Sequence, residues 1–412
     1  MAGKHSADDD FNPYRSQKSK QSGENKSKGS TKKNYNQDYG RSVKNSSNRT
    51  IKGKTGEIED IERGKKVSKS KNTKKKHKGL KILAIFLLVI AIIVLLIAGG
   101  AFYFINDKIG KMQQVDIDEG NLGVSTNENL EGYRNIAIFG VDSRSSDLDV
   151  GNRSDCIIIA NINNKTKEVK LISVYRDTYV NIEGYGLDKI THAYAYGGPE
   201  LAIQTLNTNL DLNIKEFVTV NFDSVAEAVD QLGGITMTLT SEEVDYANDY
   251  IKETANVTGK EATYISSSGT QTLNGVQAVA YSRIRYTSGG DYKRTERMRD
   301  VIEAMLNKLK TKSLGEINEF ADVMLPKVYT NLNTNDILSL VPSIASFNIT
   351  ESIGWPYETK GITLDRWYGV PVTLESNVKK LHQEEFEDPD YEVPESIQSI
   401  SDKIVNKTGY TD

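Results

Sequence analysis

The feature that most constrains this chain is an uninterrupted apolar run at residues 82–105, ILAIFLLVIAIIVLLIAGGAFYFI. None of these residues is charged. As an α-helix the run would be about 36 Å long, whereas the hydrocarbon core of a bilayer is about 30 Å thick. A cleaved signal peptide has a shorter apolar segment, and it lies at the N-terminus. The run therefore predicts one transmembrane helix that divides the chain into two parts.

The charges of these two parts differ in sign. The chain holds 52 Lys and Arg and 56 Asp and Glu residues, of which 23 and 9, respectively, lie within residues 1–81. The rest of the chain therefore carries 29 basic and 47 acidic residues. Basic segments beside a transmembrane helix stay in the cytoplasm. We expect a single-pass protein of the cell membrane with a cytoplasmic N-terminus and an extracellular C-terminal part.

Residues 1–81 are rich in Lys, Ser, Asn and Gly and poor in apolar residues, a composition that predicts disorder. This basic tail fits an anchor on anionic lipids, and it also fits a segment that binds nucleic acid or a protein partner. The predicted organisation is a disordered basic tail (1–81), a transmembrane helix (82–105), a linker (106–130), an extracellular domain (131–375) and an acidic, loosely held C-terminal tail (376–412).

Several familiar catalytic motifs are absent from the sequence. The only cysteine, Cys156, lies in an apolar run, so no disulfide framework is possible. The four histidines are scattered without an HExxH pattern, and neither a Walker A nor a GxSxG motif occurs. These absences argue against the common zinc-hydrolase, P-loop and serine-hydrolase sites.

Beyond residue 130, short apolar runs alternate with helical patterns, which predicts an α/β fold with a mixed central sheet sandwiched by helices. The polar stretch 249–269 is predicted to be a surface loop. Strands are predicted at 134–140, 155–163, 168–175, 216–222, 235–240, 349–354 and 370–374. Helices are predicted at 197–210, 223–234, 273–286, 291–312, 314–328 and 334–346.

Charged residues of both signs gather beside these elements. Each group alone is also typical of a solvated loop or of ion pairs on a helix. Arginine, however, forks onto phosphate oxygens and stays charged when desolvated. Paired aspartates bind Mg²⁺ together with phosphate oxygens and water. Taken together, the groups point to a pyrophosphate ligand. They are Asp142, Arg144, Arg153 and Asp155 between the first two strands, Arg176 and Asp177 after the third strand, and Arg283, Arg285, Asp291, Arg294 and Arg297 on predicted helices.

These residues belong to longer matching stretches within residues 133–312. In chain order they are NIAIFGVDSR, RSDCIIIANIN, LISVYRDTYV, LDKITHAYAYGG, VNFDSVAEAVDQLGGI, LNGVQAVAYSRIRY and DYKRTERMR. The set resembles the LytR-CpsA-Psr family of bacterial envelope phosphotransferases in order and spacing. The resemblance implies that a glycopolymer (teichoic acid, capsular polysaccharide or another secondary wall polymer) is moved from a polyprenyl-pyrophosphate carrier to peptidoglycan, through a phosphodiester.

The resemblance also implies a role for each charged group. It implies Mg²⁺ or Mn²⁺ as cofactor with Asp142 and Asp155 as ligands, and Arg176 and Asp291 as catalytic residues. The arginines implied to contact pyrophosphate are Arg144, Arg153, Arg176, Arg283, Arg285 and Arg294.

Three positions depart from the family pattern. Tyr175 stands where Pro is common, Thr191 where Asn is usual, and Met298 where Gln is frequent. The third change removes a polar contact to the substrate, which leaves efficiency or polymer choice open. The family also implies an apolar tunnel for the lipid. Each candidate lining residue taken alone is more typical of ordinary core packing. The candidates are Leu201, Ile203, Val225, Val229, Ile302, Met305 and Leu306.

Two other functions remain open at this point. A non-catalytic binder of lipid pyrophosphate or wall polymer would keep the arginines but could lose the metal aspartates, and this chain retains both of them. An envelope-linked transcriptional attenuator would need a folded DNA reader such as a helix-turn-helix, and residues 1–80 show none. The expected partners are therefore the lipid-linked glycopolymer, peptidoglycan and the cell membrane, with no nucleic acid.

Overall fold

The computed structural model describes residues 113–143, 148–333 and 345–411, together with Ile92, Gly110 and Asp336. The basic tail lies outside the described residues, as do Arg144 and, apart from Ile92, the apolar run at 82–105. Most of the helix predicted at 334–346 also lies outside them. Within the described part of the chain, no helix is long and apolar enough to span a bilayer.

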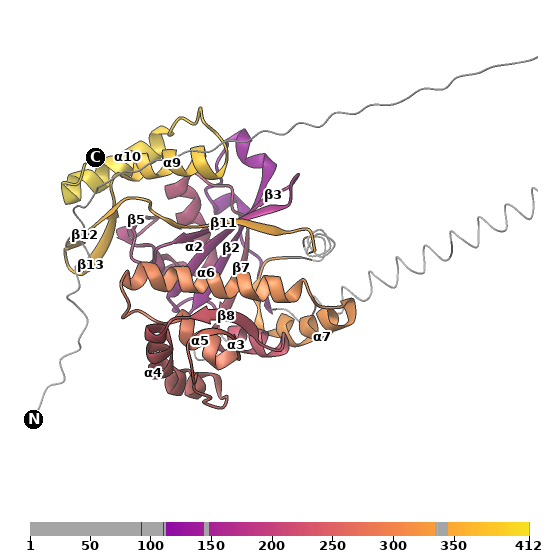
Figure 1. The fold of residues 1–412 in the computed structure, drawn as a ribbon. Helices are drawn as coiled ribbons and strands as arrows, with labels where there is room; N and C mark the ends of the chain where they lie inside the picture. Colours follow the sequence, from indigo (N-terminus) through magenta and orange to yellow (C-terminus); the bar gives the residue numbers. More distant parts are fainter. Residues whose placement is uncertain are drawn as a thin grey trace, which may run out of the picture. The chain divides into compact units, whose positions relative to one another are not determined.

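A mixed sheet forms the centre of the described residues (Figure 1). Strand β2 (Tyr133–Val141) is antiparallel to β3 (Ser154–Asn163), and β3 is antiparallel to β4 (Glu168–Val174). Strand β7 (Glu216–Asn221) runs parallel to β2, and β11 (Asn348–Trp355) runs parallel to β4. This arrangement confirms the predicted α/β fold with a mixed central sheet. The strand order is β1 (Gln113–Gln114), β10 (Tyr329–Thr330), β7 (Glu216–Asn221), β2 (Tyr133–Val141), β3 (Ser154–Asn163), β4 (Glu168–Val174) and β11 (Asn348–Trp355).

One face of the sheet packs in the largest core of the molecule. Because side chains alternate along a strand, Phe139, Ile159 and Ile172 all point to this face, where they are fully buried. Two small hairpins lie beside this layer, and a bridge between Thr178 and Gly369 connects them. The elements on this face are α2 (Ile190–Leu210), α9 (Leu374–Glu385), α10 (Glu395–Thr408), the hairpin of β5 (Tyr179–Ile182) and β6 (Gly186–Lys189), and the hairpin of β12 (Thr359–Thr363) and β13 (Trp367–Pro371).

The prediction of a loosely held tail at residues 376–412 is wrong. This segment forms most of α9 and all of α10. Ile397 and Ile404, seven residues apart on one side of α10, are buried in the main core, so the acidic residues of the segment cover a packed helix pair. The predicted linker at 106–130 is also packed in part, because Leu122 and Leu130 are fully buried in the same core.

The opposite face of the sheet is crossed by α6 (Gly290–Leu309), and Figure 1 shows this helix in front of the strands. Apolar side chains such as Ile158 and Leu171 form a smaller core beneath it. A further core lies between α6 and a helical layer next to it. That layer comprises α3 (Phe222–Gln231), β8 (Ile235–Leu239), α4 (Ser241–Thr258), β9 (Gly269–Leu273) and α5 (Gly275–Ser282), and α7 (Leu314–Met324) follows α6.

Helix α4 corrects part of the prediction of a surface loop over 249–269, because residues 249–258 are helical and only 259–268 connect α4 to β9. The helix begins with a capping box, in which the side chains of Thr240 and Glu243 each bond the backbone N–H of the other. Ala247, Ile251 and Ala255 follow at helical spacing and are buried. Two of these three residues are alanines, which add little to a hydrophobic pattern. The polar residues between them dominate the sequence, so the helix was not recognised from it.

Candidate active site

Asp155 occupies an irregularity in the pairing of β2 with β3. Gly140 pairs with Cys156 and Val141 pairs with Ser154, so Asp155 is left over between the two pairs. An extra residue in a strand disrupts the ladder locally and re-aims the side chain. The carboxylate of Asp155 lies 2.8 Å from Nη1 of Arg176. Asp155, which contacts Arg176, therefore lies at a bulge in the strand rather than at a regularly paired position.

Arg176 lies just beyond the end of β4, between two carboxylates. Its Nη1 contacts Asp155, and its Nε lies 3.6 Å from Oδ2 of Asp177. Burial disfavours the charged guanidinium, but Asp155, Asp177 and Asp291 together outweigh burial and raise the pKa of Arg176. The guanidinium is thus held in its charged form, and two of its nitrogens already face carboxylate oxygens.

Asp177 connects this arginine to the start of α2. The Nζ atom of Lys189, the residue before α2, lies 2.8 Å from Oδ1 of Asp177. Burial opposes the charged carboxylate, yet Arg176 and Lys189 hold the pKa of Asp177 below its usual value. Lys189 was not among the predicted site residues, although it lies in the matching stretch LDKITHAYAYGG.

Helix α6 brings Asp291 and Arg294 to the same region. Nη2 of Arg294 lies 2.8 Å from Oδ1 of Asp291, and Nε of Arg285 lies 3.5 Å from the same oxygen. Burial lowers the pKa of Arg294, and the charges of Arg285 and Arg176 lower it further against the opposite effect of Asp291 and Asp155. Arg285 was predicted within a helix, but α5 ends at residue 282, before it.

Arg294 combines burial with unused hydrogen-bonding capacity. The residue is only 4% exposed, and its Nε has no hydrogen-bond partner among the described residues. A buried guanidinium is costly unless its charge and its N–H groups are matched. An anionic ligand beside Arg294 would therefore be stabilised by charge and by hydrogen bonds.

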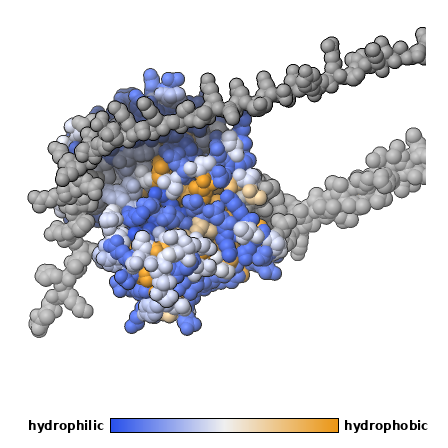
Figure 2. Space-filling model, in the orientation of Figure 1, coloured by the Kyte–Doolittle hydropathy of each residue, from blue (hydrophilic) through white to orange (hydrophobic). Residues whose placement is uncertain are grey.

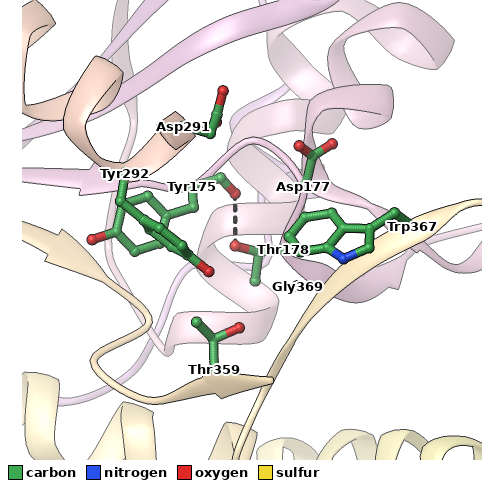
Figure 3. Close-up of a pocket in the computed structure, with 8 residues that line it drawn as sticks. All are labelled: Tyr175, Asp177, Thr178, Asp291, Tyr292, Thr359, Trp367 and Gly369. Atoms are coloured by element: carbon green, nitrogen blue, oxygen red, sulfur yellow. Dashed lines mark hydrogen bonds between the residues drawn. The ribbon is translucent and has the colours of Figure 1, made fainter. Parts of the chain in front are cut away.

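A small pocket lies beside these charges (Figure 3). The rings of Tyr175 and Tyr292 meet edge to face there, with centroids 4.4 Å apart. The pocket volume of about 30 Å³ suits a water-sized group rather than a whole substrate. Its lining comes from the end of β4, the start of α6 and the β12–β13 hairpin, and consists of Tyr175, Asp177, Thr178, Asp291, Tyr292, Thr359, Trp367 and Gly369.

Two of the arginines have partners in α4. Arg283 contacts Glu253 at 3.1 Å and donates to Oγ1 of Thr254 at 3.0 Å. Arg297 is almost fully buried, and its Nε lies 3.1 Å from Oε1 of Glu243. Arg297 also donates to the Ile284 carbonyl and to Thr287 Oγ1, so it ties α6 to the connection that precedes it. These contacts give Arg297 a structural role.

The predicted metal ligands lie at adjacent ends of β2 and β3. The backbone N–H of Asp142 donates to the Arg153 carbonyl at 3.4 Å, next to Asp155, and the side chains of Asp142 and Arg153 are exposed. In the described part of the chain, no three His, Cys, Asp or Glu residues are grouped to hold a metal. Mg²⁺ commonly takes one or two carboxylates and completes its shell with phosphate oxygens and water. A metal held by these two aspartates would therefore need phosphate oxygens and water to complete its shell.

The departures from the family pattern are accommodated without loss of the fold. Thr191 is buried, and its Oγ1 donates to the Ser154 carbonyl at 2.9 Å, which fixes α2 to the strand that carries Asp155. Gly354 leaves room for the Tyr175 ring, because a Cβ at that position would collide with it. Met298 is buried.

The candidate tunnel residues do not gather in one place. Ile203 belongs to the core on the α2 face, and Val229 belongs to the core between α3, α4 and α5. Ile302 alone among the seven packs with the core beneath α6. That core has partly exposed apolar neighbours, Ile138 and Ile349 among them. Figure 2 shows hydrophobic patches on an otherwise mainly hydrophilic surface in this view.

Comparison with known proteins identifies a family model and relatives that match this chain. A model of the LytR_cpsA_psr family matches residues 101–381. The polyisoprenyl-teichoic acid–peptidoglycan teichoic acid transferase TagT of Bacillus subtilis (strain 168) is 31% identical over 305 residues, which cover 71% of this chain and 92% of the relative. TagU of the same organism, a transferase of the same description, is 34% identical over 277 residues, or 64% of this chain and 81% of the relative.

The crystal structure of B. subtilis TagT matches with a TM-score of 0.50 and 28% sequence identity, covering 65% of this chain and 98% of that one. The match of the family model extends across the sheet, α2, α6 and the residues of the charged cluster. This chain therefore belongs to the LytR-CpsA-Psr family.

Proposed function

We propose that this protein transfers an anionic glycopolymer from a polyprenyl-pyrophosphate carrier to peptidoglycan, forming a phosphodiester on the outer side of the membrane. The observation that carries the proposal is the meeting of the partly buried Arg176 and the buried Arg294 with Asp155 and Asp291 where β3, β4 and α6 approach one another. The names of TagT and TagU, which describe transfer of teichoic acid to peptidoglycan, support the polymer class.

The reaction requires positioning and neutralisation of negative charge more than a protein nucleophile. An acceptor hydroxyl attacks the phosphorus that carries the polymer, and the bond from that phosphorus to the lipid phosphate breaks. Polyprenyl phosphate leaves with the electron pair of the broken bond. In this scheme Arg176 and Arg294 bind the phosphate oxygens, and they replace part of their present carboxylate contacts with the substrate.

The carboxylates have separate roles in the proposal. Asp291, whose side chain is 32% exposed, aligns Arg294 and takes up the proton of the acceptor hydroxyl. Asp142 and Asp155 would hold Mg²⁺ or Mn²⁺, which supplies further positive charge to the phosphates when it is bound. The apolar sheet face beneath α6, with partly exposed Ile138 and Ile349, is the side on which we place the lipid.

The test uses the full-length protein in detergent with a defined lipid-linked polymer and nascent peptidoglycan, and it detects the product phosphodiester directly. We expect transfer with Mg²⁺, loss of transfer in EDTA, and recovery when Mg²⁺ is restored. Calorimetric titration of Mn²⁺ in the presence of lipid pyrophosphate should show binding to the unmodified protein. The same titration should show none with Asp142→Asn or Asp155→Asn.

Full activity in the chelator would refute the metal assignment. Tight binding of lipid pyrophosphate without any transfer would refute the enzyme and leave a non-catalytic binder. Thermal unfolding of the two aspartate variants serves as the control for folding, because both residues lie at strand ends outside the apolar cores.

A further inference from the structure

Two exposed tyrosines form a stacked pair on the α2 side of the sheet. Tyr185 lies in the turn of the β5–β6 hairpin, and Tyr196 lies on α2. Their ring centroids are 4.4 Å apart and their planes differ by 14°. Tyr185 is 57% exposed and Tyr196 is 37% exposed, so a broad aromatic surface faces solvent. Neither ring belongs to the apolar cores.

Polar contacts hold Tyr196, one ring of this pair, in place. The Tyr196 hydroxyl donates to Oδ2 of Asp188 at 2.7 Å, and Nδ1 of His192 lies 2.9 Å from the same oxygen. Burial raises the pKa of Asp188, but the hydrogen bonds from Tyr196 and His192 outweigh it and lower that pKa. The carboxylate therefore stays charged and keeps Tyr196 in place. A surface that is ordered in advance loses little entropy when a ligand binds.

The pair is connected to the charged cluster through successive contacts. Asp188 is followed by Lys189, whose Nζ lies 2.8 Å from Asp177. Asp177 in turn follows Arg176 in the chain and contacts its guanidinium. The start of α2 contacts the site directly, because the backbone N–H of Thr191 donates to the Arg176 carbonyl at 3.1 Å. Tyr196 lies five residues further along α2, which covers the face of the sheet opposite the one that α6 crosses.

We propose that Tyr185 and Tyr196 form the binding platform for the glycan of the acceptor peptidoglycan. A pyranose ring has one face of C–H groups, which packs on an aromatic ring, and hydroxyl groups at its edge, which bond to polar side chains. Here the rings are bordered by His192 and by Arg366, whose charge is near enough to affect Tyr196. A protein partner would instead require a larger continuous apolar patch.

The choice of acceptor over donor rests on the proposed function. In phosphoryl transfer the attacking and leaving oxygens lie roughly in line on opposite sides of phosphorus. We place the lipid on the α6 face, so the acceptor hydroxyl approaches from the α2 side, where Asp291 lines a pocket together with residues of the β12–β13 hairpin. The tyrosine pair is on that side, and its partner Asp188 precedes Lys189, which contacts Asp177 beside Arg176.

The test compares full-length wild-type protein with Tyr185→Ala, Tyr185→Phe and Tyr264→Ala. Tyr264 is a matched control, since it is 56% exposed and has no part in the platform or the charged cluster. Binding of soluble peptidoglycan glycan strands is measured by calorimetry without donor. Donor binding is measured separately with lipid pyrophosphate, and the KM for the acceptor is measured in the transfer assay.

We expect Tyr185→Ala to weaken glycan-strand binding and to raise the acceptor KM by about tenfold, the loss of one stacking surface, with little change in donor binding. Tyr185→Phe keeps the ring and should retain binding, as should Tyr264→Ala. Unchanged glycan binding in Tyr185→Ala would overturn the proposal, and so would an equal loss of donor binding. Failure of the wild-type protein to transfer would refute the proposed function, whereas the direct glycan titration still tests the platform.

Discussion

At the scale of single residues, the partly buried Arg176 and the buried Arg294 differ in how the protein balances their charge. Arg176 has Asp155 and Asp177 beside it, and its pKa is raised in spite of burial. Arg294 is more deeply buried, lies near other guanidinium groups, and its pKa is lowered. Arg176 is therefore held firmly before any ligand arrives, and Arg294 gains more from an added anion.

The geometry around Arg176 predicts that lysine cannot replace it. The guanidinium contacts Asp155 with Nη1 and faces Asp177 with Nε, two directions that one ammonium group cannot reproduce. Arg176→Ala and Arg176→Lys should both lower kcat by roughly 10²–10³-fold, as expected for the loss of one charge-stabilising group in the transition state. Steady-state transfer rates measure this effect, with circular dichroism of both variants as the folding control. Recovery of most of the rate by lysine would show that Arg176 acts as a simple counter-charge.

His382 predicts a pH dependence of stability. The residue is fully buried, Nε2 lies 2.9 Å from the Leu210 carbonyl, and the ring stacks on Tyr391. Burial lowers its pKa, against the opposite effect of the Leu210 carbonyl, Asp211 and Asp388. The unfolded chain therefore binds the proton more readily than the folded chain. The stability that neutral His382 supports is complete above about pH 6.5 and declines as pH falls below that value.

The free energy of unfolding, measured in urea at about pH 7.5 and about pH 5.5, tests this dependence. The wild-type protein should lose more stability between the two values than His382→Gln, which has no titrating group at the site. An equal loss in both proteins would assign the acid sensitivity to other residues.

At the scale of elements, the long apolar strands and the amphipathic helices α3 and α6 were predictable, whereas α4, α10 and the β5–β6 hairpin were not. Strands β2, β3 and β4 are covered on both faces, so their sequences are nearly continuous apolar runs that stand out from the rest. Helix α2 begins at Ile190 rather than at 197, because the chain continues through a kink at Gly197 and Gly198. Two glycines followed by a proline are typical of a helix start, so the prediction placed the start of α2 at this kink inside the helix.

The site was predictable by residue type but not by contact. The sequence places arginines and aspartates near strand ends, and the structure brings Arg176, Asp155, Asp291 and Arg294 together. The sequence gives no sign that Arg297 pairs with Glu243, because the two residues are 54 positions apart in the chain. Trp367, which lines the pocket, comes from a late hairpin whose position depends on tertiary packing.

The packing of α10 predicts that the C-terminal segment contributes to stability. Ile404 is 1% exposed in the main core, so Ile404→Ala should lower the free energy of unfolding by about 2–5 kcal/mol through lost burial and a residual cavity. Lys403→Ala, at an exposed neighbouring position on the same helix, should change it by no more than about 0.5 kcal/mol. Urea denaturation monitored by fluorescence compares the two variants. A negligible effect of Ile404→Ala would mean that α10 is not docked.

At the scale of the whole molecule, charge and function are divided along the chain. The part beyond residue 81 is acidic, with 29 basic and 47 acidic residues, yet it brings Arg176 and the buried Arg294 into one cluster. A net negative surface disfavours nonspecific retention of anionic polymer, while the local positive charge attracts phosphate groups. In the proposed arrangement the lipid lies on the α6 face and the acceptor glycan on the α2 face, so the two substrates approach the arginines from opposite sides.

This arrangement is useful only if the folded part lies on the side of the membrane that holds the wall, and the charge asymmetry predicts that orientation. Protease added to intact, wall-stripped cells should therefore digest epitopes placed beyond residue 113 and spare an epitope within residues 1–80. Both epitopes should be cleaved after the membrane is permeabilised, which controls for their intrinsic susceptibility. Because peptidoglycan lies outside the membrane, cleavage of the N-terminal epitope with protection of the folded part would place the arginines away from the acceptor and refute the proposed transfer.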